Sequence, residues 1–373
     1  MKLKCVYMRG GTSKAVFFHK KDLPEDISTW PKLFMKVMGT PDSKQIDGMG
    51  GAAQITSKIA VVAPSEQPDC DVDYTFFQVG VEEPIVADNL NCGNISCAVG
   101  PFAVDEGLVT AEEPVTVVRV YNTNTHKVIE EHVPVKAGKA LTKGVASIMG
   151  VPGTGAGMDI YFFEKPSGAA TGKLFPTGNA LDILEPEGYP SVEATLIDCS
   201  NPVMILASKN LGLEGGEIEP FLSDKELLTH IEAIRSAAAV KYGFVEHAKD
   251  ATEQSLAAPK VAVISRPHDF KGSDGNIIHK ENMDICSRII SVGAFHKTHP
   301  ITSGIAIAAA ASIPGTVAWN LIGENWDHKT LKIGHPYGIL PIKIVMDGDS
   351  VAKAGTIRTA RRIMDGYIYI EEE

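Results

Sequence analysis

Short runs of apolar residues, many of them alternating with polar positions, recur along the whole chain and predict a protein rich in β-strands. Gly, Pro, Asn and Asp bound most of these runs and favour turns between them. The runs cover residues 4–10, 15–20, 57–64, 71–80, 115–123, 127–135, 193–198, 202–208, 260–265, 341–348 and 365–372. Segments with helical periodicity are fewer, so the pattern predicts an α+β fold.

Three segments predict helices. Residues 28–39 gather apolar side chains on one face and end at Gly39, a residue typical of helix ends. Residues 223–240 begin with Ser223 and Glu226, which have the spacing of a capping box. A third helix is expected over residues 282–294.

Two further segments, 93–104 and 303–313, are apolar on nearly every side, and such a helix must be enclosed by protein. Each has a polar start and lies in its own half of the chain. The simplest interpretation is a duplicated architecture, in which a barrel-like sheet surrounds one central helix in each half. The Gly/Pro-rich stretch 171–190 predicts domains 1–180 and 181–373, with the last strands free to pack back on the first domain.

Composition narrows the class of protein. The chain has 373 residues, 44% hydrophobic and 22% charged, and a net charge of -11 without long acidic runs. This profile indicates a globular protein and argues against a nucleic-acid binder, but it leaves small anionic substrates open. The N-terminal segment predicts no signal peptide, and no apolar run is long enough to cross a membrane. Six scattered cysteines without a CxxC pair predict reduced thiols in the cytoplasm.

Two stretches resemble ligand-binding motifs, but their neighbouring residues or their spacing do not fit such sites. The stretch GMGGAA at 48–53 fits a dinucleotide fingerprint, but a polar segment precedes it and a β-branched run follows, so a tight loop is expected instead. His296, His299 and Cys286 lack the spacing of a zinc site, and no metal is predicted. His296 remains a candidate for contact with a substrate.

Cys92 and Lys58 are the residues whose positions most suggest chemistry. Cys92 precedes the apolar segment 93–104, where the first turn of a helix favours a thiolate; a small packing residue is an equally good interpretation. Cys97, within that segment, is expected to be packing only. Lys58 stands in an apolar strand, where alternation would turn it towards solvent. If it faces inward, its desolvated amine would serve as a base near neutral pH.

Two groups of polar residues have the donors that a carboxylate needs. In MRGGTSK, Arg9 offers a planar fork, Thr12 and Ser13 offer hydroxyls, and two glycines allow close approach of the backbone, although a plain hairpin turn fits equally well. The other half of the chain offers a similar set, comprising Asn201, Arg266, Thr302 and Ser303. We expect the polar starts of the two enclosed helices, 93–104 and 303–313, to hold a di- or tricarboxylate between them.

The chain resembles the PrpF/methylitaconate Δ-isomerase family over essentially its whole length, in six motifs that occur in order. These are MRGGTSK, IDGMGGAAQITSKIAVV, NCGNISCAVGPFAVDEGLV, PTGN, HKTHPITSGIAIAAAASIPGT and RTARRIMDGYIYI. The resemblance implies a diaminopimelate-epimerase-like fold, with two pseudo-repeated domains and the active site between them. It also implies a homodimer or homotetramer that needs no cofactor and acts on small unsaturated polycarboxylates.

The resemblance carries the family's catalytic lysine and cysteine onto Lys58 and Cys92. The residues expected to bind substrate are Arg9, Thr12, Ser13, Gly50, Gly51, Gly93, Asn94, Asn201, Arg266, His296, Thr302 and Ser303. The chain departs from the family's common pattern at Ala15 and at Ala53–Gln54. Thr302 and Ser303 also stand where the epimerases and racemases of the wider fold have a second cysteine, which disfavours a two-thiol racemase.

These observations predict a cytoplasmic isomerase that moves a proton and a double bond by acid–base catalysis. The favoured reaction converts 3-methylitaconate to 2,3-dimethylmaleate, with Lys58 and Cys92 as base and acid in either order. Isomerisation of 2-methylaconitate between cis and trans forms, and tautomerisation of 4-oxalomesaconate, are the alternatives within this class. A non-catalytic carboxylate-binding protein is the alternative from a different class.

Overall fold

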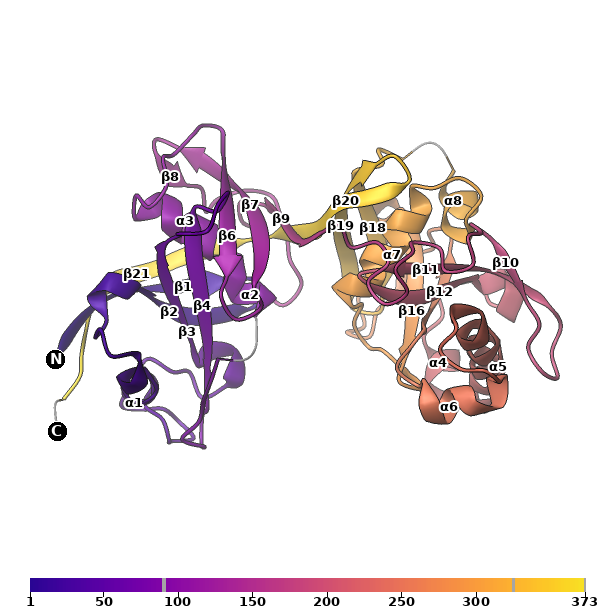
Figure 1. The fold of residues 1–373 in the computed structure, drawn as a ribbon, viewed down its shortest axis with the longest axis horizontal. Helices are drawn as coiled ribbons and strands as arrows, with labels where there is room; N and C mark the ends of the chain where they lie inside the picture. The colour runs from indigo at the N-terminus through magenta and orange to yellow at the C-terminus, as the bar shows by residue number, and fades with distance from the viewer. Residues whose placement is uncertain (89–91, 324–325, 372–373) are drawn as a thin grey trace. The chain divides into compact units, whose positions relative to one another are not determined.

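The computed structural model describes residues 1–88, 92–323 and 326–371 and divides the chain into two compact units (Figure 1). Unit 1 comprises Met1–Phe162 and Ile357–Glu373, and unit 2 comprises Phe163–Thr356. The division differs from the predicted boundary at 180/181, because Phe163, Leu174 and Phe175 pack against the core of unit 2. The C-terminal strand does pack back on unit 1 by pairing with the N-terminal strand.

Unit 1 contains a long sheet in which most neighbouring strands are antiparallel. Its order is β21–β1–β2–β3–β4–β6–β7–β9, with parallel pairing between β2 and β3 and between β4 and β6. The strands are β1 (Lys2–Gly10), β2 (Ser13–His19), β3 (Lys58–Pro64), β4 (Val72–Val79), β6 (Val115–Asn122), β7 (Lys127–Lys136), β9 (Met158–Glu164) and β21 (Ala360–Tyr369), with the short β5 (Val86–Ala87) and β8 (Lys139–Ala140) beside them.

Two short helices, α2 (Gly93–Ser96) and α3 (Val99–Asp105), form the centre of unit 1. Every long strand of the sheet contributes side chains to the apolar core around them. Phe102 of α3 is fully buried there and lies against the rings of Phe17 and His19. The predicted enclosed helix over 93–104 is therefore confirmed, although it is divided into two at Cys97 and Ala98.

Helix α1 (Trp30–Met38) covers the other face of the same sheet. Its apolar side chains pack with Ile59 and Val61 of β3, and it ends at Gly39, whose φ of 76° is the left-handed conformation that glycine adopts easily. The helix predicted over 28–39 is confirmed. Because both faces of β3 are covered, alternation along this strand exposes neither of them to solvent.

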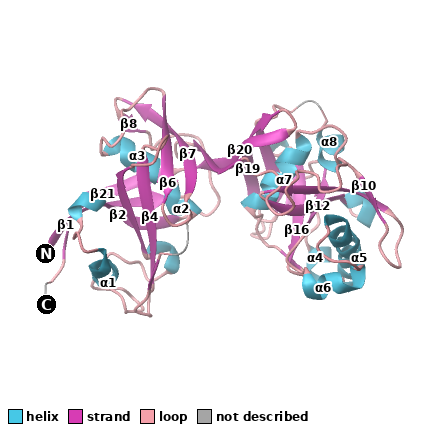
Figure 2. Ribbon diagram, viewed as in Figure 1, coloured by secondary structure: helices cyan, strands magenta, loops and turns pink. Residues whose placement is uncertain are grey.

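Unit 2 repeats this plan with its own strands (Figure 2). The order is β10–β11–β12–β13–β16–β18–β19–β20, with parallel pairing between β12 and β13 and between β16 and β18. These strands are β10 (Asp182–Leu184), β11 (Val192–Cys199), β12 (Asn201–Ala207), β13 (Lys260–Ser265), β16 (Ile285–Ser291), β18 (Thr330–His335), β19 (Gly338–Asp347) and β20 (Ser350–Arg358), and the two-residue strands are β14 (Phe270–Lys271), β15 (Ile277–Ile278) and β17 (Ala294–Phe295).

Helices cover both faces of the unit 2 sheet. Helices α7 (Ile301–Ala311) and α8 (Val317–Ile322) lie in a core formed by strands β11 to β20, while α5 (Lys225–Tyr242) packs on the opposite face. Two short helices, α4 (Glu219–Ser223) and α6 (Ala251–Gln254), flank α5 in the chain. The predicted α+β class, with a sheet around an enclosed helix in each half, is confirmed.

Two helix predictions were wrong in detail. Residues 282–294 contain β16 and β17 instead of a helix, because a short run that is buried on both faces has no period that separates strand from helix. The cap of α5 is Asp224, whose side chain accepts from the amide of Leu227, whereas Ser223 belongs to α4.

Among the residues that the structure describes, no helix is both long enough and apolar enough to cross a membrane.

The enclosed position of α3 predicts a large effect of removing its central ring. Phe102→Ala should lower the free energy of unfolding of unit 1 by ~3–5 kcal/mol, because the surrounding strands cannot collapse into the cavity. Urea unfolding followed in both variants tests this, with Val145→Ala as the control, since Val145 is 96% exposed. A loss below ~1 kcal/mol for Phe102→Ala would contradict the enclosed position.

Candidate active site

Lys58 is the first residue of β3 and faces the interior of unit 1. Only 6% of it is exposed, and it stands directly opposite Gln78 in the antiparallel pair of β3 and β4. Its Nζ donates a hydrogen bond to Oε1 of Gln78. The interpretation that alternation turns Lys58 to solvent was wrong, because the face of β3 that carries Lys58 also carries Ala60 and Val62, which pack in the core around α2 and α3.

The surroundings of the Lys58 amine are largely apolar. Phe76 lies two residues before Gln78 on the same face of β4, and its ring centre is 5.1 Å from Nζ. Tyr74, fully buried, follows on that face. Burial lowers the pKa of Lys58, and the charge of Cys92 opposes this shift in part. The structure therefore supplies the desolvated lysine that a base near neutral pH requires.

Cys92 is the residue immediately before α2 and is half-buried against the core of unit 1. Its carbonyl accepts hydrogen bonds from the amide and hydroxyl of Ser96, at 2.9 and 3.0 Å. Phe76, whose ring faces the Lys58 amine, belongs to the apolar core against which Cys92 packs, so both predicted catalytic side chains border that core. Asn91, the residue before Cys92, lies outside the described residues.

Asn94 joins the start of α2 to the hairpin turn between β1 and β2. Its Nδ2 donates to Oγ1 of Thr12 at 3.1 Å, and its Oδ1 accepts from the Thr12 amide at 3.4 Å. The structure thus brings Thr12 together with Asn94, which stands two residues after Cys92 in the chain. A Cβ atom added to Gly93 would lie 3.7 Å from the ring of Phe162.

The glycines of MRGGTSK serve a different purpose from the one predicted. A Cβ atom on Gly10 would lie 2.3 Å from the carbonyl oxygen of Asn94, and one on Gly11 would lie 2.2 Å from its Oδ1. Gly11 also has a φ of +51°. These glycines allow α2 to approach the hairpin closely, and the Gly11 amide donates to the carbonyl of Thr359.

Arg9 and Ser13 flank this turn. Nη1 of Arg9 donates to the carbonyls of Gly11 and Thr359 at 2.8 and 2.9 Å, so only the edge formed by Nε and Nη2 can serve as a carboxylate fork. Burial lowers the pKa of Arg9 from its usual value. Ser13 begins β2 and is 2% exposed.

The loop with Gly50 and Gly51 is attached to the end of α1. The Gly50 amide donates to the carbonyl of Met38 at 3.2 Å and is committed to that contact, against its predicted use as a substrate donor. Gly51 is exposed on the same loop, close to Thr56. The segment continues to β3 without a helix of the dinucleotide-binding kind, as predicted.

A buried carboxyl group lies deeper in unit 1. Glu131 is fully buried on β7, and its Oε2 accepts from the amide of Gly100 in α3 at 2.9 Å. Burial raises the pKa of Glu131 to about 8. Burial also raises the pKa of the nearby Cys97 thiol to about 12, which agrees with its predicted packing role.

Unit 2 brings together three of the residues predicted there. Nδ2 of Asn201 lies 3.4 Å from Oγ1 of Thr302, in the first turn of α7. Ser303, the next residue, is fully buried. Among the described residues, neither Oδ1 of Asn201 nor Oγ of Ser303 has a hydrogen-bond partner. This helix start therefore has unused polar atoms beside its first amides.

His296 and Arg266 differ in their relation to that helix start. Nδ1 of His296 donates to the carbonyl of Thr298 at 2.6 Å, on the segment that leads into α7, which leaves Nε2 as the acceptor. Arg266 follows the end of β13, whereas Asn201 begins the parallel neighbour β12. The two residues stand at opposite strand ends, eight positions apart in the strand register, or roughly 26 Å at ~3.3 Å per residue, so the structure does not bring Arg266 to this group.

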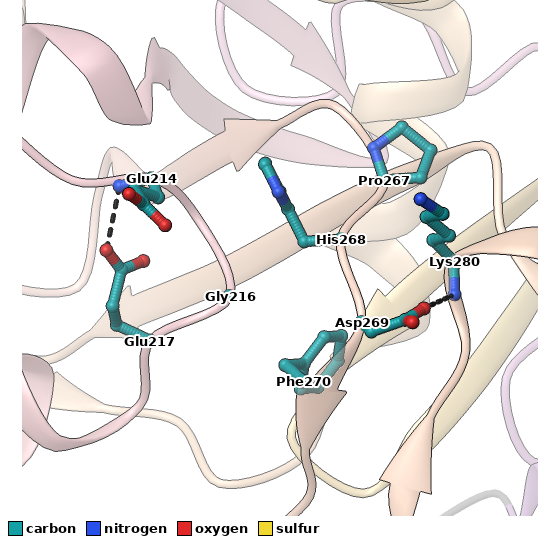
Figure 3. A pocket seen from close by; sticks show the side chains of 8 residues that line it. All are labelled: Glu214, Gly216, Glu217, Pro267, His268, Asp269, Phe270 and Lys280. Atoms are coloured by element: carbon teal, nitrogen blue, oxygen red, sulfur yellow. Dashed lines mark hydrogen bonds between the residues drawn. The ribbon is translucent and has the colours of Figure 1, made fainter.

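A pocket of about 350 Å³ is lined by Pro267, the residue after Arg266, together with residues that include Glu217, His268 and Lys280 (Figure 3). Its carboxylates are partly committed within the chain: Glu217 accepts from the amide of Glu214, and Asp269 accepts from the amide of Lys280, both at 2.7 Å. In the described part of the chain, no three His, Cys, Asp or Glu residues are grouped in a way that would hold a metal ion.

Comparison with known proteins identifies the family. The PrpF protein family matches residues 1–371, so the chain belongs to this family and the resemblance is confirmed. The chain is 41% identical to 3-methylitaconate isomerase of Eubacterium barkeri, over all of this chain and 98% of that protein. It is 35% identical to 2-methyl-aconitate isomerase of Shewanella oneidensis, over 99% and 97% of the two chains.

A solved structure agrees with this assignment. The crystal structure of methylitaconate-delta-isomerase matches with a TM-score of 0.85 and 42% identity, over all of this chain and 96% of that one. These relatives are isomerases, so the predicted class of enzyme is confirmed. The predicted homodimer or homotetramer stays a prediction.

Sequence reasoning missed Gln78, Tyr74 and Glu131. Alternation along the strand places Gln78 and Tyr74 on the same face of β4. Only the register of β3 against β4, however, shows that Gln78 stands opposite Lys58. Glu131 stands in KVIEEHVPV, where two adjacent glutamates resemble the polar positions of an alternating strand. Both glutamates are buried, and nothing in the local pattern shows that Glu131 is the one enclosed by the core.

The raised pKa of Glu131 predicts a pH-dependent stability. Folded protein keeps this carboxyl protonated up to about pH 8, whereas the unfolded chain loses the proton near ~4.3. The stability from this group is therefore full below ~4.3 and falls as pH rises towards about 8, by on the order of 1 kcal/mol per pH unit. Glu131→Gln removes this contribution.

Urea unfolding between pH 5 and pH 8 tests the assignment. As pH rises, the free energy of unfolding of Glu131→Gln should increase relative to that of the wild type. The variant Glu112→Gln, at an exposed position, should have the same pH profile as the wild type. Parallel pH profiles for Glu131→Gln and the wild type would exclude a protonated Glu131.

Proposed function

We propose that the chain is an allylic isomerase that converts 3-methylitaconate to 2,3-dimethylmaleate, with Lys58 as the base and Cys92 as the acid. One observation carries the proposal: the Lys58 amine is buried and donates to a neutral amide and, among the residues that the structure describes, it has no carboxylate partner. The 41% identity to 3-methylitaconate isomerase supports the choice of substrate.

The chemistry follows from the substrate. In 3-methylitaconate the carbon that bears the methyl group is next to a carboxylate and to the carbon–carbon double bond, so loss of its proton gives a delocalised dienolate. Lys58 takes this proton, and Cys92 gives one to the terminal methylene carbon, which becomes a methyl group. A proton passing from Lys58 to Cys92 then restores both groups, and no atom is gained or lost.

The dienolate carries its extra charge on a carboxylate, so donors at that carboxylate favour the transition state. Unit 1 offers Nε and Nη2 of Arg9 and the hydroxyls of Thr12 and Ser13. Within unit 2, the first turn of α7 with Thr302 and Ser303 has donors of the same kind. His296, through Nε2, is a further candidate for contact with the substrate.

The six cysteines are unpaired thiols, which supports a cytoplasmic setting.

Isomerisation of 2-methylaconitate is the second candidate function. A relative at 35% identity carries that name, and the same base would form the same kind of dienolate before rotation and reprotonation. Incubating purified protein with methylitaconate, methylaconitate, aconitate and oxalomesaconate, and following ultraviolet absorbance, tests the substrate. Turnover of methylaconitate with none of methylitaconate would replace the first candidate by the second.

Removing either catalytic group should abolish most turnover. Lys58→Ala and Cys92→Ala should each lower kcat by ~10²–10⁴-fold, the usual contribution of a proton-transfer group. Thermal unfolding should remain close to that of the wild type, which separates lost chemistry from lost folding. Full activity in both variants would contradict the assignment of Lys58 and Cys92 as the proton-transfer groups.

Proton exchange distinguishes an enzyme from a carboxylate-binding protein. In D₂O, the wild type should exchange the proton on the methyl-bearing carbon of methylitaconate, as observed by NMR, whereas Lys58→Ala should not. Binding of the acid without exchange in the wild type would favour the non-catalytic alternative.

A further inference from the structure

Gln78 has more hydrogen bonds than a side chain that only fills space requires. Its Nε2 donates to the carbonyls of Ser57 and Gln54, at 2.9 and 3.0 Å, and lies 3.4 Å from its neighbour's carbonyl at Val79. Carbonyl oxygens only accept, so this end of the amide must be the NH₂ group. Oε1 consequently points at Nζ of Lys58 and accepts from it.

The backbone holds both partners of this contact in place. Lys58 and Gln78 are paired residues of β3 and β4, and the amide of Val79 donates to the carbonyl of Ser57 at 3.1 Å. Gln54 lies in the short turn that leads into β3, close to Ala53, where the chain departs from the common pattern of its family. The orientation of Gln78 is therefore set by the main chain that leads into Lys58, through the carbonyls of Gln54 and Ser57.

A neutral acceptor has a particular consequence for a lysine that works as a base. A carboxylate at this place would stabilise the ammonium form and withhold the lone pair, whereas an amide oxygen aims the amine without adding a charge. We propose that Gln78 is the positioning residue of the site, which holds the Lys58 amine towards the substrate without a counter-charge. This inference rests on the proposed function, because it assigns Gln78 a part in the work of Lys58.

The other groups around Lys58 leave this role to Gln78. Cys92, from the start of α2, is the titratable group whose charge acts on Lys58. Tyr74 lies further along the same face of β4, and burial raises its pKa well above the usual range. Phe76 contributes a ring face and no acceptor that could direct a hydrogen bond.

Two substitutions at Gln78 should act in opposite directions on the pH profile. In Q78E the carboxylate raises the pKa of Lys58, so the rise of kcat/KM with pH should move up by ~1 unit or more. In Q78M the ammonium form loses its acceptor, so the rise should move to lower pH. Q78M should also lower the plateau by ~10-fold or more, because the amine is no longer aimed.

The experiment measures kcat/KM with methylitaconate from pH 5 to pH 10 in the wild type, Q78E, Q78M and Q67E. Gln67 is exposed in the connection between β3 and β4, at the far end of these strands from Lys58, so Q67E adds the same charge without touching the site. Q67E should reproduce the wild-type profile. Circular dichroism and thermal unfolding identify any variant that fails to fold, and Q78N replaces Q78M in that case, with the same expected direction.

The outcomes separate this inference from the proposed function. Opposite shifts in Q78E and Q78M support the positioning role, which a purely structural residue would not produce. Unmoved profiles, or shifts in the same direction, overturn it. If Lys58→Ala is inactive while the Gln78 profiles do not move, only the inference about Gln78 fails. If Lys58→Ala keeps full activity, the proposed function itself fails.

Discussion

The burial of one lysine amine is the constraint on which the candidate site depends. Removing an ammonium group from water is costly, and the neutral amine is favoured wherever no carboxylate compensates. At Lys58 the partners are an amide oxygen, an aromatic ring and a thiol, and burial lowers the pKa of the amine. A protein with no use for this arrangement would gain stability from an apolar residue at the same place.

The fold of unit 1 maintains this constraint from both sides of the sheet. Helix α1 covers the outer face of β3, so that Lys58 cannot reach solvent by that route. Helices α2 and α3 fill the inner face, and Cys92, which precedes α2, packs against the same core. Gly10 and Gly11 let Asn94 approach the first hairpin within contact distance, which fixes where α2 begins. The burial of Lys58 therefore depends on the enclosed helices, and the position of α2 depends in turn on Gly10 and Gly11.

Much of this was predictable from the sequence, for identifiable reasons. The enclosed helices were visible because 93–104 and 303–313 are apolar on all sides, and Lys58 was visible as a lysine within an apolar run. Gln78 was not, because its role depends on the register of β3 against β4. The predicted set with Arg266 did not assemble, since pattern alone does not give the end of a sheet at which a residue stands. The helix predicted over 282–294 was wrong because a strand buried on both faces has no distinctive period.

The central claim is that Lys58 is available as a neutral base, and a direct titration of its amine tests this most closely. Lysine labelled with ¹³C at Cε reports the charge of each amine by NMR, and the Lys58 signal is assigned by its absence in Lys58→Arg. The account predicts that the Lys58 signal titrates at lower pH than the signals of the exposed lysines and moves to still lower pH when Cys92 is replaced by serine. A Lys58 signal that titrates together with the exposed lysines in both proteins would contradict it.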